Sequence, residues 1–356
     1  MTNQYDKTIP VLDHHCHICF AQPIEESVQG YEALFHRLGI HRAGLLSCPD
    51  SSHSEGGVDI LENLKMLYLK ERLSIPCYAY AGFTWHWDEP DRYADFAGQM
   101  LDMGFDGFKS LTMHPRNRKE LGKGLNHPSF RGFFETADKH SSVMVCHVGD
   151  PRTSWHLDNP SEEMIRLGRV YDESNLSLDQ LYDEMTEVIA TYRNMKFVLA
   201  HFYFMSDNYE RVCRLLDENP HVYLDLTPGG VMYVHFTKDP ELWREFFLKY
   251  SDRIILGSDH YALGYGEIRY DLARSFLEGT QPFDYYGDTV SPFCLPREVL
   301  DNIYWNNIHA LQPPMPRPVD RALAYEHCRY IADCCAYQLT AQGTANLKVM
   351  TEFWKP

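Results

Sequence analysis

The chain has 356 residues and a mass of 41.5 kDa, a length that fits two ordinary domains or one large α/β barrel with additions. Apolar residues make up 44%, aromatic residues 13% and charged residues 23%, which excludes disordered, collagen-like and coiled-coil proteins. Asp and Glu number 50 against 33 Lys and Arg, a formal net charge of −17. Because an acidic surface repels phosphate backbones, we expect small-molecule partners and no nucleic acid.

The chain resembles a reduced protein of the cytoplasm. Its ten cysteines are scattered rather than dense, unlike the cysteines of secreted scaffolds. Cys16 and Cys19 have the spacing of a redox motif, but no second such pair follows. The start, MTNQYDKTIP, lacks the basic and apolar regions of a signal peptide, and no run approaches the ~18 apolar residues of a membrane helix. We therefore expect a cytoplasmic protein that does not bind membranes.

Short apolar runs, each ending in a polar residue, alternate with longer stretches of helical periodicity. Near-continuous apolar strands are typical of a parallel sheet that is covered on both faces, and eight strand-plus-helix units close a barrel. The sequence predicts an α/β fold, a (β/α)8 TIM barrel at about 9–311 with a C-terminal helical extension at about 312–356, in one domain of residues 1–356. The runs lie at 9–18, 42–48, 75–83, 105–111, 142–148, 195–201, 221–227 and 253–259.

Capping signals predict several helix ends. Ser177 and Gln180 form a capping-box pattern before a helix, and Ser206 or Asp207 is placed to cap the next one, which Asn219-Pro220 ends. After the last strand we expect a long loop at 260–293, a helix near 297–311, the stiff linker QPPMPRP and a closing helix near 319–340.

Polar residues at the strand ends carry the chemistry. His15 and His17 are two residues apart, so they share one strand face, whereas His14 and Cys16 are expected to face the other way. Two imidazoles on one face form half of a zinc site, although such pairs are also common without a metal. His147, His201 and Asp259 each end a further apolar run. Since all strand ends meet at the carboxyl mouth of a barrel, the five residues together predict a metal site.

This combination resembles the amidohydrolase superfamily, and within it the amidohydrolase-2 branch of metal-dependent barrel enzymes. The likeness runs from Val11 to Asp259 through VLDHHCH, GFDGFKSLTMH, VMVCHVGDP, KFVLAHF, VYLDLT and DRIILGSDH. The resemblance implies that His15, His17, His147 and Asp259 hold one divalent ion, and that His201 is a catalytic residue beside it. Zn²⁺ is the expected ion, while Mn²⁺, Fe²⁺ and Co²⁺ also suit such ligands.

The expected chemistry follows from such an ion. A metal with an open position lowers the pKa of a bound water toward ~7. Asp259 is then placed to take a proton from the attacking water and pass it to the leaving group. His201 is placed to polarise the substrate carbonyl.

Lys109 leaves the number of ions open. In relatives with two ions a carboxylated lysine on the fourth strand bridges them, and here Lys109 would then act with His147 and His201 on a second ion. One ion is favoured because the stretch GFDGFK looks more like the one-ion branch. In that case Lys109 binds substrate. The alternative without a function is a buried lysine paired with a carboxylate such as Asp225.

Further polar residues are expected near the mouth. Arg116 and Arg152 are candidates for a substrate carboxylate, and Trp155 and Trp85 for the wall of its pocket. The residues His114, His156, His86 and Trp87 lie in the same loops. Asp225 ends the seventh run and is a candidate hydrogen-bond partner of a metal-bound histidine. The long insertion from Asp150 to Ser177 predicts a lid or a subunit contact.

Three functions remain open from the sequence. The first is a hydrolase that cleaves a C–N (amide-like) bond or a lactone in a small, carboxylate-bearing molecule. The second is a non-oxidative decarboxylase of the same branch, although one decarboxylase subgroup has a glutamate where this chain has Phe204. The third is a barrel that binds a metal or ligand without catalysis. Barrels of this branch often dimerise, so we expect a homodimer.

Overall fold

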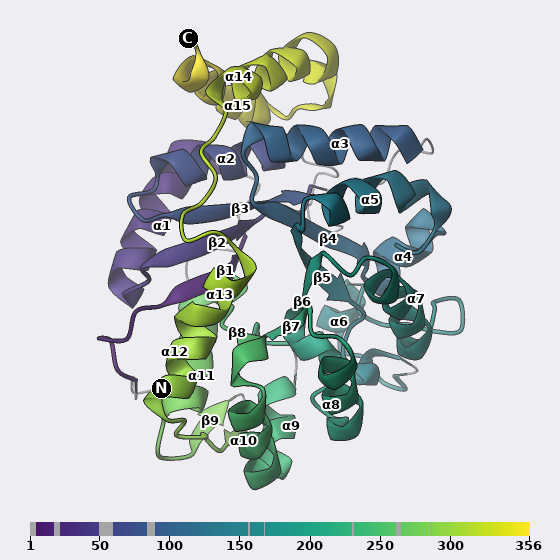
Figure 1. The fold of residues 1–356 in the computed structure, drawn as a ribbon, viewed down its shortest axis with the longest axis vertical. Coiled ribbons are helices and arrows are strands. Elements are labelled where there is room, and N and C mark those ends of the chain that lie inside the picture. The colour runs from purple at the N-terminus through teal and green to yellow at the C-terminus, as the bar shows by residue number, and fades with distance from the viewer. Residues whose placement is uncertain are drawn as a thin grey trace.

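Eight parallel strands, in the order β1 to β8, form a nearly closed barrel in a computed structural model of the chain (Figure 1). The structure describes residues 5–17, 22–49, 60–83, 90–155, 157–166, 168–229, 231–260, 265–285 and 287–356. Each predicted run overlaps one strand, although β4 extends two residues beyond its run, and the predicted TIM barrel is confirmed. The strands are β1 (Leu12–Cys16), β2 (Arg42–Leu46), β3 (Cys77–Gly82), β4 (Gly107–Met113), β5 (Val143–Val148), β6 (Lys196–Leu199), β7 (Val222–Asp225) and β8 (Ile254–Ile255).

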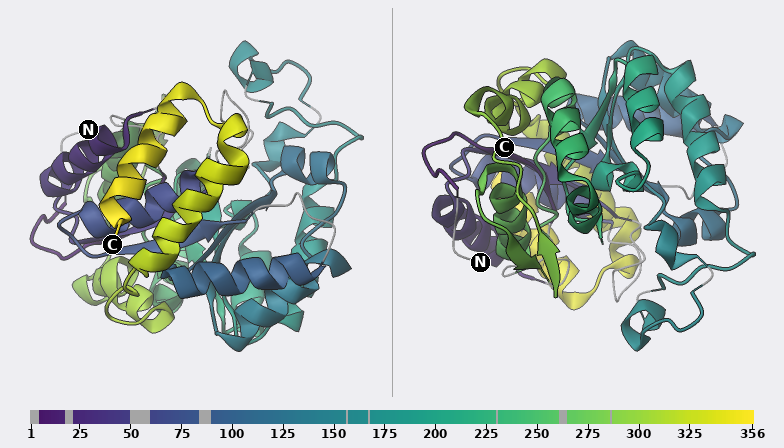
Figure 2. Two further views of the ribbon diagram at one scale, coloured as in Figure 1. Left: turned by 90° about the horizontal axis from the view of Figure 1, so that it is seen from above. Right: turned by 90° about the horizontal axis from the view of Figure 1, so that it is seen from below.

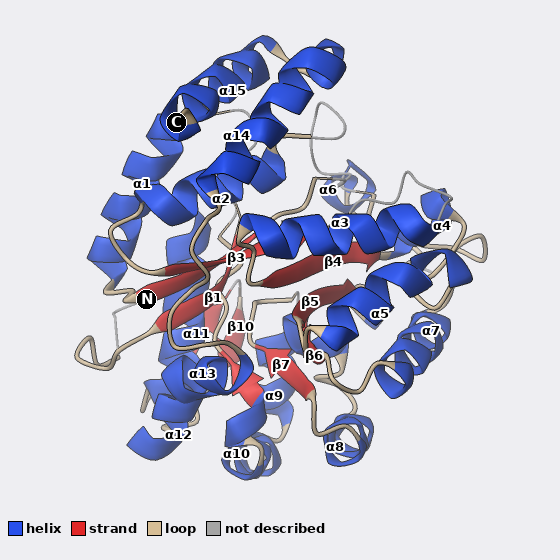
Figure 3. Ribbon diagram, turned by 45° about the horizontal axis from the view of Figure 1, so that its top comes forward, coloured by secondary structure: helices blue, strands red, loops and turns tan. Residues whose placement is uncertain are grey.

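Helices surround the strands (Figure 3). One or two of them follow each of the first seven strands, as parallel neighbours require. The predicted capping box opens α7, where the Ser177 hydroxyl accepts from the Gln180 amide at 3.3 Å and the Gln180 side chain accepts from the Ser177 amide at 2.9 Å. These helices are α1 (Ile24–Leu38), α2 (Glu62–Arg72), α3 (Pro90–Met103), α4 (Pro115–Leu121), α5 (Arg131–Lys139), α6 (Glu162–Arg166), α7 (Leu178–Thr191), α8 (Tyr209–Glu218), α9 (Met232–Lys238) and α10 (Pro240–Lys249).

The barrel interior is closed at the amino-terminal ends of the strands. A continuous helical segment consists of α12 (Arg297–Asp301), a π-helical turn (Asn302–Asn306) and α13 (Asn307–Leu311). Its Ile308 and Leu311 pack against inward-facing strand residues such as Tyr80 and Val145. A larger apolar layer fills the space between strands and helices. The carboxyl ends of the strands are therefore the end at which a site can open.

The first and last strands are joined mainly around Asp13. The backbone amide of His14 donates to Leu256 O at 3.0 Å, and that of Asp259 donates to His15 O at 2.8 Å. The buried Asp13 carboxylate accepts from the Ser258 amide at 3.0 Å and from the Ser258 hydroxyl. Burial raises the pKa of Asp13 to about 6, because a carboxylate loses its hydration there.

Three expectations outside the barrel strands were wrong. The expected loop at 260–293 contains α11 (Tyr265–Glu278) and an antiparallel pair, β9 (Phe283–Tyr285) and β10 (Asp288–Val290). Asn208, rather than Ser206 or Asp207, caps α8. The extension has two main helices instead of one, α14 (Arg321–Tyr330) and α15 (Ala341–Trp354), which lie across α2 and α3 (Figure 2).

Nine cysteines of the described residues are free thiols, Cys16 among them. Cys19 lies outside the described residues. None of the helices in the described part of the chain combines the length and the apolar character that crossing a bilayer requires.

Candidate metal centre

His15 and His17 at the end of β1 turn one ring nitrogen of each toward the other. The Nδ1–H of His15 donates to Asp225 Oδ2 at 2.7 Å, and the Nδ1–H of His17 donates to Leu46 O at 2.9 Å. These acceptors leave a lone pair on each Nε2, and the two Nε2 atoms lie 3.1 Å apart. Two lone pairs at this distance repel each other unless a cation lies between them.

Asp259, just beyond β8, adds an oxygen to this pair. Its Oδ1 lies 3.4 Å from His17 Nε2 and 3.8 Å from His15 Nε2, and the three ligand atoms all lie within 4.8 Å of one another. In a tetrahedral zinc site with bonds near 2.0–2.1 Å, neighbouring ligand atoms are about 3.3 Å apart. The observed separations of 3.1, 3.4 and 3.8 Å fit that spacing.

The protonation states in this group suit a metal. Burial, followed by the Lys109 charge, holds the pKa of His15 well below its usual value, so the ring is neutral at neutral pH. Burial also acts to raise the pKa of Asp259, but the neighbouring His17 and the charge of Arg269 outweigh it and hold that pKa well below its usual value. Neutral imidazoles and an ionised carboxylate are the forms that bind cations.

Arg269 holds both the carboxylate and the backbone carbonyl of Asp259. Arg269 of α11 contacts Asp259 Oδ2 through Nη1, and the same nitrogen donates to Asp259 O at 2.9 Å. The residue itself has a φ of 56°, in the left-handed region that few residues other than glycine adopt, with Asn and Asp the more frequent exceptions. Arg269 thereby leaves Oδ1 as the oxygen that faces the histidines.

His201 begins a left-handed turn at the end of β6. Four consecutive residues, from His201 to Phe204, have φ between 50° and 57°, a conformation that costs about 1–2 kcal/mol per residue. The His201 amide donates to Asp225 Oδ1 at 2.8 Å, and Tyr182 donates to Tyr203 O at 2.7 Å. Strain of this kind persists where the surroundings impose it, often at functional sites.

The four ligands expected for one ion do not form one group. His15, His17 and Asp259 come together, but His147 groups with His114 and Asp150. His147 Nδ1 instead lies 3.1 Å from His201 Nε2. The Nδ1 of His201 lies 3.3 Å from Thr227 O and the Nε2 of His147 lies 3.0 Å from Gly149 O, so these two rings also turn lone pairs toward each other.

Lys109 and Asp225 both lie beside His15. The buried Lys109 has its Nζ 3.2 Å from His15 Nε2. Its pairing with Asp225, the alternative without a function, was wrong: the Asp225 carboxylate accepts instead from His15, from the His201 amide and from the Thr227 amide. Among the described residues, no carboxylate lies within 4.0 Å of Lys109 Nζ. Asp225 thus contacts two of the predicted site histidines.

The residues that were expected to bind substrate either have other partners in the structure or lie outside the described residues. Arg116 pairs with Glu120 and Arg152 with Asp179, and all four side chains are exposed. The Trp155 indole donates to Leu176 O at 3.0 Å, so it packs within the insertion. Trp85, like His86, Trp87 and His156, lies outside the described residues.

His14 differs from the expectation from strand alternation. Its Nε2 lies 2.6 Å from the hydroxyl of Tyr80, a residue of the barrel interior. The pairing of β1 with β2 shifts register between Asp13 and Cys16, which breaks the two-residue alternation. Burial lowers the pKa of His14 to about 4.

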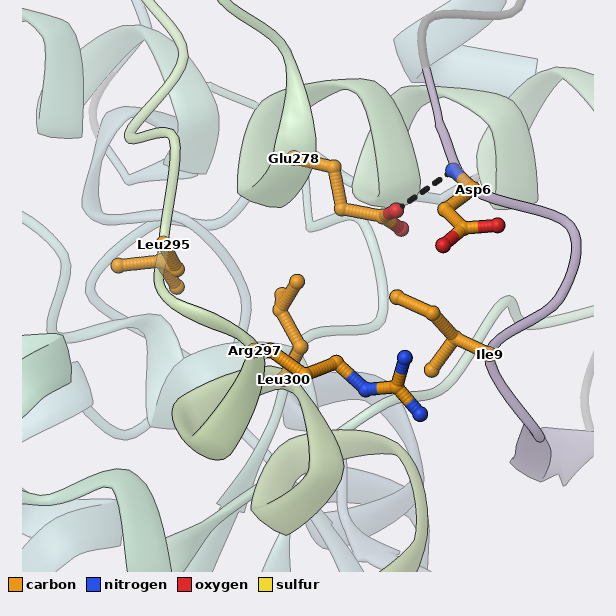
Figure 4. Close-up of a pocket in the computed structure, with 6 residues that line it drawn as sticks. All are labelled: Asp6, Ile9, Glu278, Leu295, Arg297 and Leu300. Atoms are coloured by element: carbon orange, nitrogen blue, oxygen red, sulfur yellow. Dashed lines mark hydrogen bonds between the residues drawn. The ribbon is translucent and has the colours of Figure 1, made fainter.

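A surface hollow of about 410 Å³ lies away from these residues, next to the helical segment that closes the amino-terminal end. It lies between Ile9, Leu295 and Leu300, with Arg297 at its side (Figure 4). There Glu278 accepts from the backbone amide of Asp6 at 2.8 Å. None of the predicted site residues lines it.

Comparison with known proteins identifies the family of the chain. The family model described as amidohydrolase, of the amidohydrolase-2 type, matches residues 63–311. Among solved structures, 4-oxalomesaconate hydratase from Rhodopseudomonas palustris is 11% identical with a TM-score of 0.56, covering 91% of this chain and 98% of that one. The 2,6-dihydroxybenzoate decarboxylase from Rhizobium is 12% identical with a TM-score of 0.53, covering 85% and 98%.

A dihydroxybenzoic acid decarboxylase from Polaromonas, with bound manganese and the inhibitor 2-nitroresorcinol, is also 12% identical, with a TM-score of 0.51 and coverage of 85% and 96%. Identities this low show a shared fold only. No curated protein matches the sequence. Because the family model covers well over half of the chain, the protein belongs to the amidohydrolase family, in its amidohydrolase-2 branch.

Proposed function

We propose that this chain is a metal-dependent hydrolase that cleaves a C–N (amide-like) bond or a lactone in a small, carboxylate-bearing molecule. The observation that carries the proposal is the group of His15, His17 and Asp259, whose ligand atoms have the spacing of a metal site. His201 and Lys109 lie beside this group and give it further polar groups toward a substrate.

One divalent cation would be held by His15, His17 and Asp259, with His147 as the fourth predicted ligand and Zn²⁺ as the first candidate ion. The donors suit Mn²⁺, Fe²⁺ and Co²⁺ as well, and the Polaromonas structure holds manganese. When bound, the cation supplies Lewis acidity and lowers the pKa of a water molecule toward neutrality.

The side chains of this chain would then move the protons and hold the substrate. Asp259 is ionised, so its Oδ1 can accept a proton from the attacking water and return it to the leaving nitrogen or oxygen. His201, fixed by Asp225 and Thr227, would orient the substrate carbonyl. Lys109 would pair with the substrate carboxylate, because it has no carboxylate partner among the described residues.

Non-oxidative decarboxylation is the second candidate, since two of the structures similar in fold are decarboxylases by name. One feature weighs against the decarboxylase subgroup with a glutamate after the sixth strand. Phe204 occupies that sequence position and stacks on His201, with ring centroids 5.1 Å apart, so no carboxyl group lies there.

The test combines metal analysis with turnover. Wild type, Asp259→Asn and His147→Ala are assayed for metal content and against a panel of lactones, amides and carboxylic acids, with exposed Asp179→Asn as the control. We expect bound metal and turnover in wild type and the control, reduced in the other two. Incorporation of ¹⁸O from water into the product supports hydrolysis, whereas release of CO₂ without it favours the decarboxylase. A protein that holds no metal and gains none on reconstitution contradicts both.

A further inference from the structure

A second group of metal-ligating side chains lies beside His147. His114 follows β4, His147 lies in β5, and Asp150 comes two residues after β5 ends. One ligand atom from each lies within 4.8 Å of the others, and His114 and Asp150 are buried. His147 turns Nδ1 toward His201 and Nε2 toward Gly149 O and Asp150, so its two nitrogens serve different neighbours.

The separations within this group suit a cation. His114 Nε2 lies 3.3 Å from Asp150 Oδ2, and His147 Nε2 lies 3.9 Å from Asp150 Oδ1. These values lie close to the spacing of about 3.3 Å between ligands of a tetrahedral zinc ion. The hydroxyl of Tyr171 contacts Asp150 Oδ2 and is a fourth donor. Two imidazoles, a carboxylate and a phenol suit Zn²⁺, Mn²⁺ or Fe²⁺.

The charge of the buried Asp150 carboxylate also favours a bound cation. Within the described residues, the two imidazoles are the only basic side chains with a nitrogen closer than 4.0 Å to its carboxylate, and no lysine or arginine nitrogen reaches it. A buried carboxylate needs a compensating positive charge or a metal ion. The proposed hydrolase chemistry does not use Asp150, His114 or Tyr171.

We propose that His114, His147, Asp150 and Tyr171 form a second divalent-cation site with a structural role. Tyr171 belongs to the insertion that runs from Asp150 to Ser177, and its backbone amide donates to Ser154 O at 2.9 Å. An ion here ties this insertion to the ends of β4 and β5. On binding, the ion takes the place of the proton on His147 Nε2, and that proton moves to Nδ1, which then donates to His201 Nε2. His147 then serves this site, while His15, His17 and Asp259 remain the ligands of the first ion.

This site differs from a two-ion centre bridged by Lys109, because it uses neither Lys109 nor His201. Protein stripped with a chelator is dialysed against Mn²⁺ or Zn²⁺, and the bound metal is counted. We expect about two ions per chain in wild type and about one in Asp150→Asn and in His114→Gln. Asp259→Asn also retains about one, and the Asp150→Asn, Asp259→Asn double variant retains none. Exposed Asp179→Asn matches wild type, and Lys109→Met and His201→Asn keep the ion at Asp150.

Limited proteolysis supplies a second readout. Added Mn²⁺ is expected to protect the insertion from cleavage in wild type and in Asp259→Asn, but not in Asp150→Asn or Tyr171→Phe. The proposal is overturned if wild type binds one ion that Asp150→Asn retains, or if protection by metal survives in Asp150→Asn. Loss of turnover in Asp259→Asn is measured separately, so the proposed hydrolase and this second site succeed or fail independently.

Discussion

Asp225 allows stability and metal binding to be separated by two substitutions of one residue. Its Oδ1 accepts from the amides of His201, at 2.8 Å, and Thr227, at 3.2 Å, whereas Oδ2 accepts from His15 Nδ1 at 2.7 Å. Asp225→Ala leaves the buried amides of His201 and Thr227 without this acceptor, and leaves the Thr227 hydroxyl, at 3.0 Å, as the remaining acceptor of His15 Nδ1. At about 1–3 kcal/mol per unpaired donor, and with water entering the space of the lost side chain, we expect a loss of about 3–5 kcal/mol in the free energy of unfolding.

Asp225→Asn acts differently. The amide oxygen keeps the two backbone donors, so stability falls by only about 1 kcal/mol. The amide NH₂ group now faces His15 Nδ1 and requires that nitrogen to accept, which moves the ring proton to Nε2, the atom that faces His17. Metal affinity should therefore fall about 10–100-fold. Urea unfolding of metal-free protein and chelator competition measure the two effects, with Asp179→Asn as control. Wild-type affinity in Asp225→Asn would refute the assigned tautomer.

Three further predictions concern other residues. Lys109→Met should raise the free energy of unfolding of metal-free protein by about 1–2 kcal/mol, because it removes a buried ammonium; a loss of stability in urea unfolding contradicts this. Gly257→Ala places a methyl group 2.7 Å from His15 Cβ and should cost about 1–3 kcal/mol, whereas Gly98→Ala, which meets nothing within 4 Å in a helix, should gain up to about 1 kcal/mol. Equal thermal shifts in the two glycine variants would contradict the packing argument. Burial holds the pKa of His221 below its usual value, so below pH 6.5 the unfolded chain binds a proton that the folded chain does not, and the free energy of unfolding decreases as the pH is lowered. His221→Gln should reduce this dependence by at most about 1.4 kcal/mol per pH unit. An unchanged dependence in urea titrations across pH 4–8 would argue against it.

The barrel and the strand-end residues were predictable for one physical reason. Strands covered on both faces read as apolar runs, and a polar residue that ends such a run must lie at the mouth. This placed His15, His17, His201 and Asp259 at the same end of the barrel. It could not show how the side chains divide between groups, because the path of the chain after β5 brings Asp150 to His147.

Two other contacts carried no usable sequence signal. Arg269 reaches Asp259 from α11, within a segment expected to be a loop, and nothing in its spacing marks it. His14 faces Tyr80 because β1 shifts register against β2, and a register shift depends on the pairing of two strands rather than on either alone. His114 did have a signal, since it follows an apolar strand as His147 does, but a single histidine at a strand end is often only structural.

The seam between β1 and β8 has a kinetic consequence. The two strands are the first and last of the barrel, β8 spans only Ile254–Ile255, and Asp13 joins them through Ser258. The predicted ligands His15, His17 and Asp259 lie on both sides of this seam. An ion bound there has to be released before the barrel can open along that line. Bound metal should therefore lower the unfolding rate constant and lengthen the lifetime of the closed barrel.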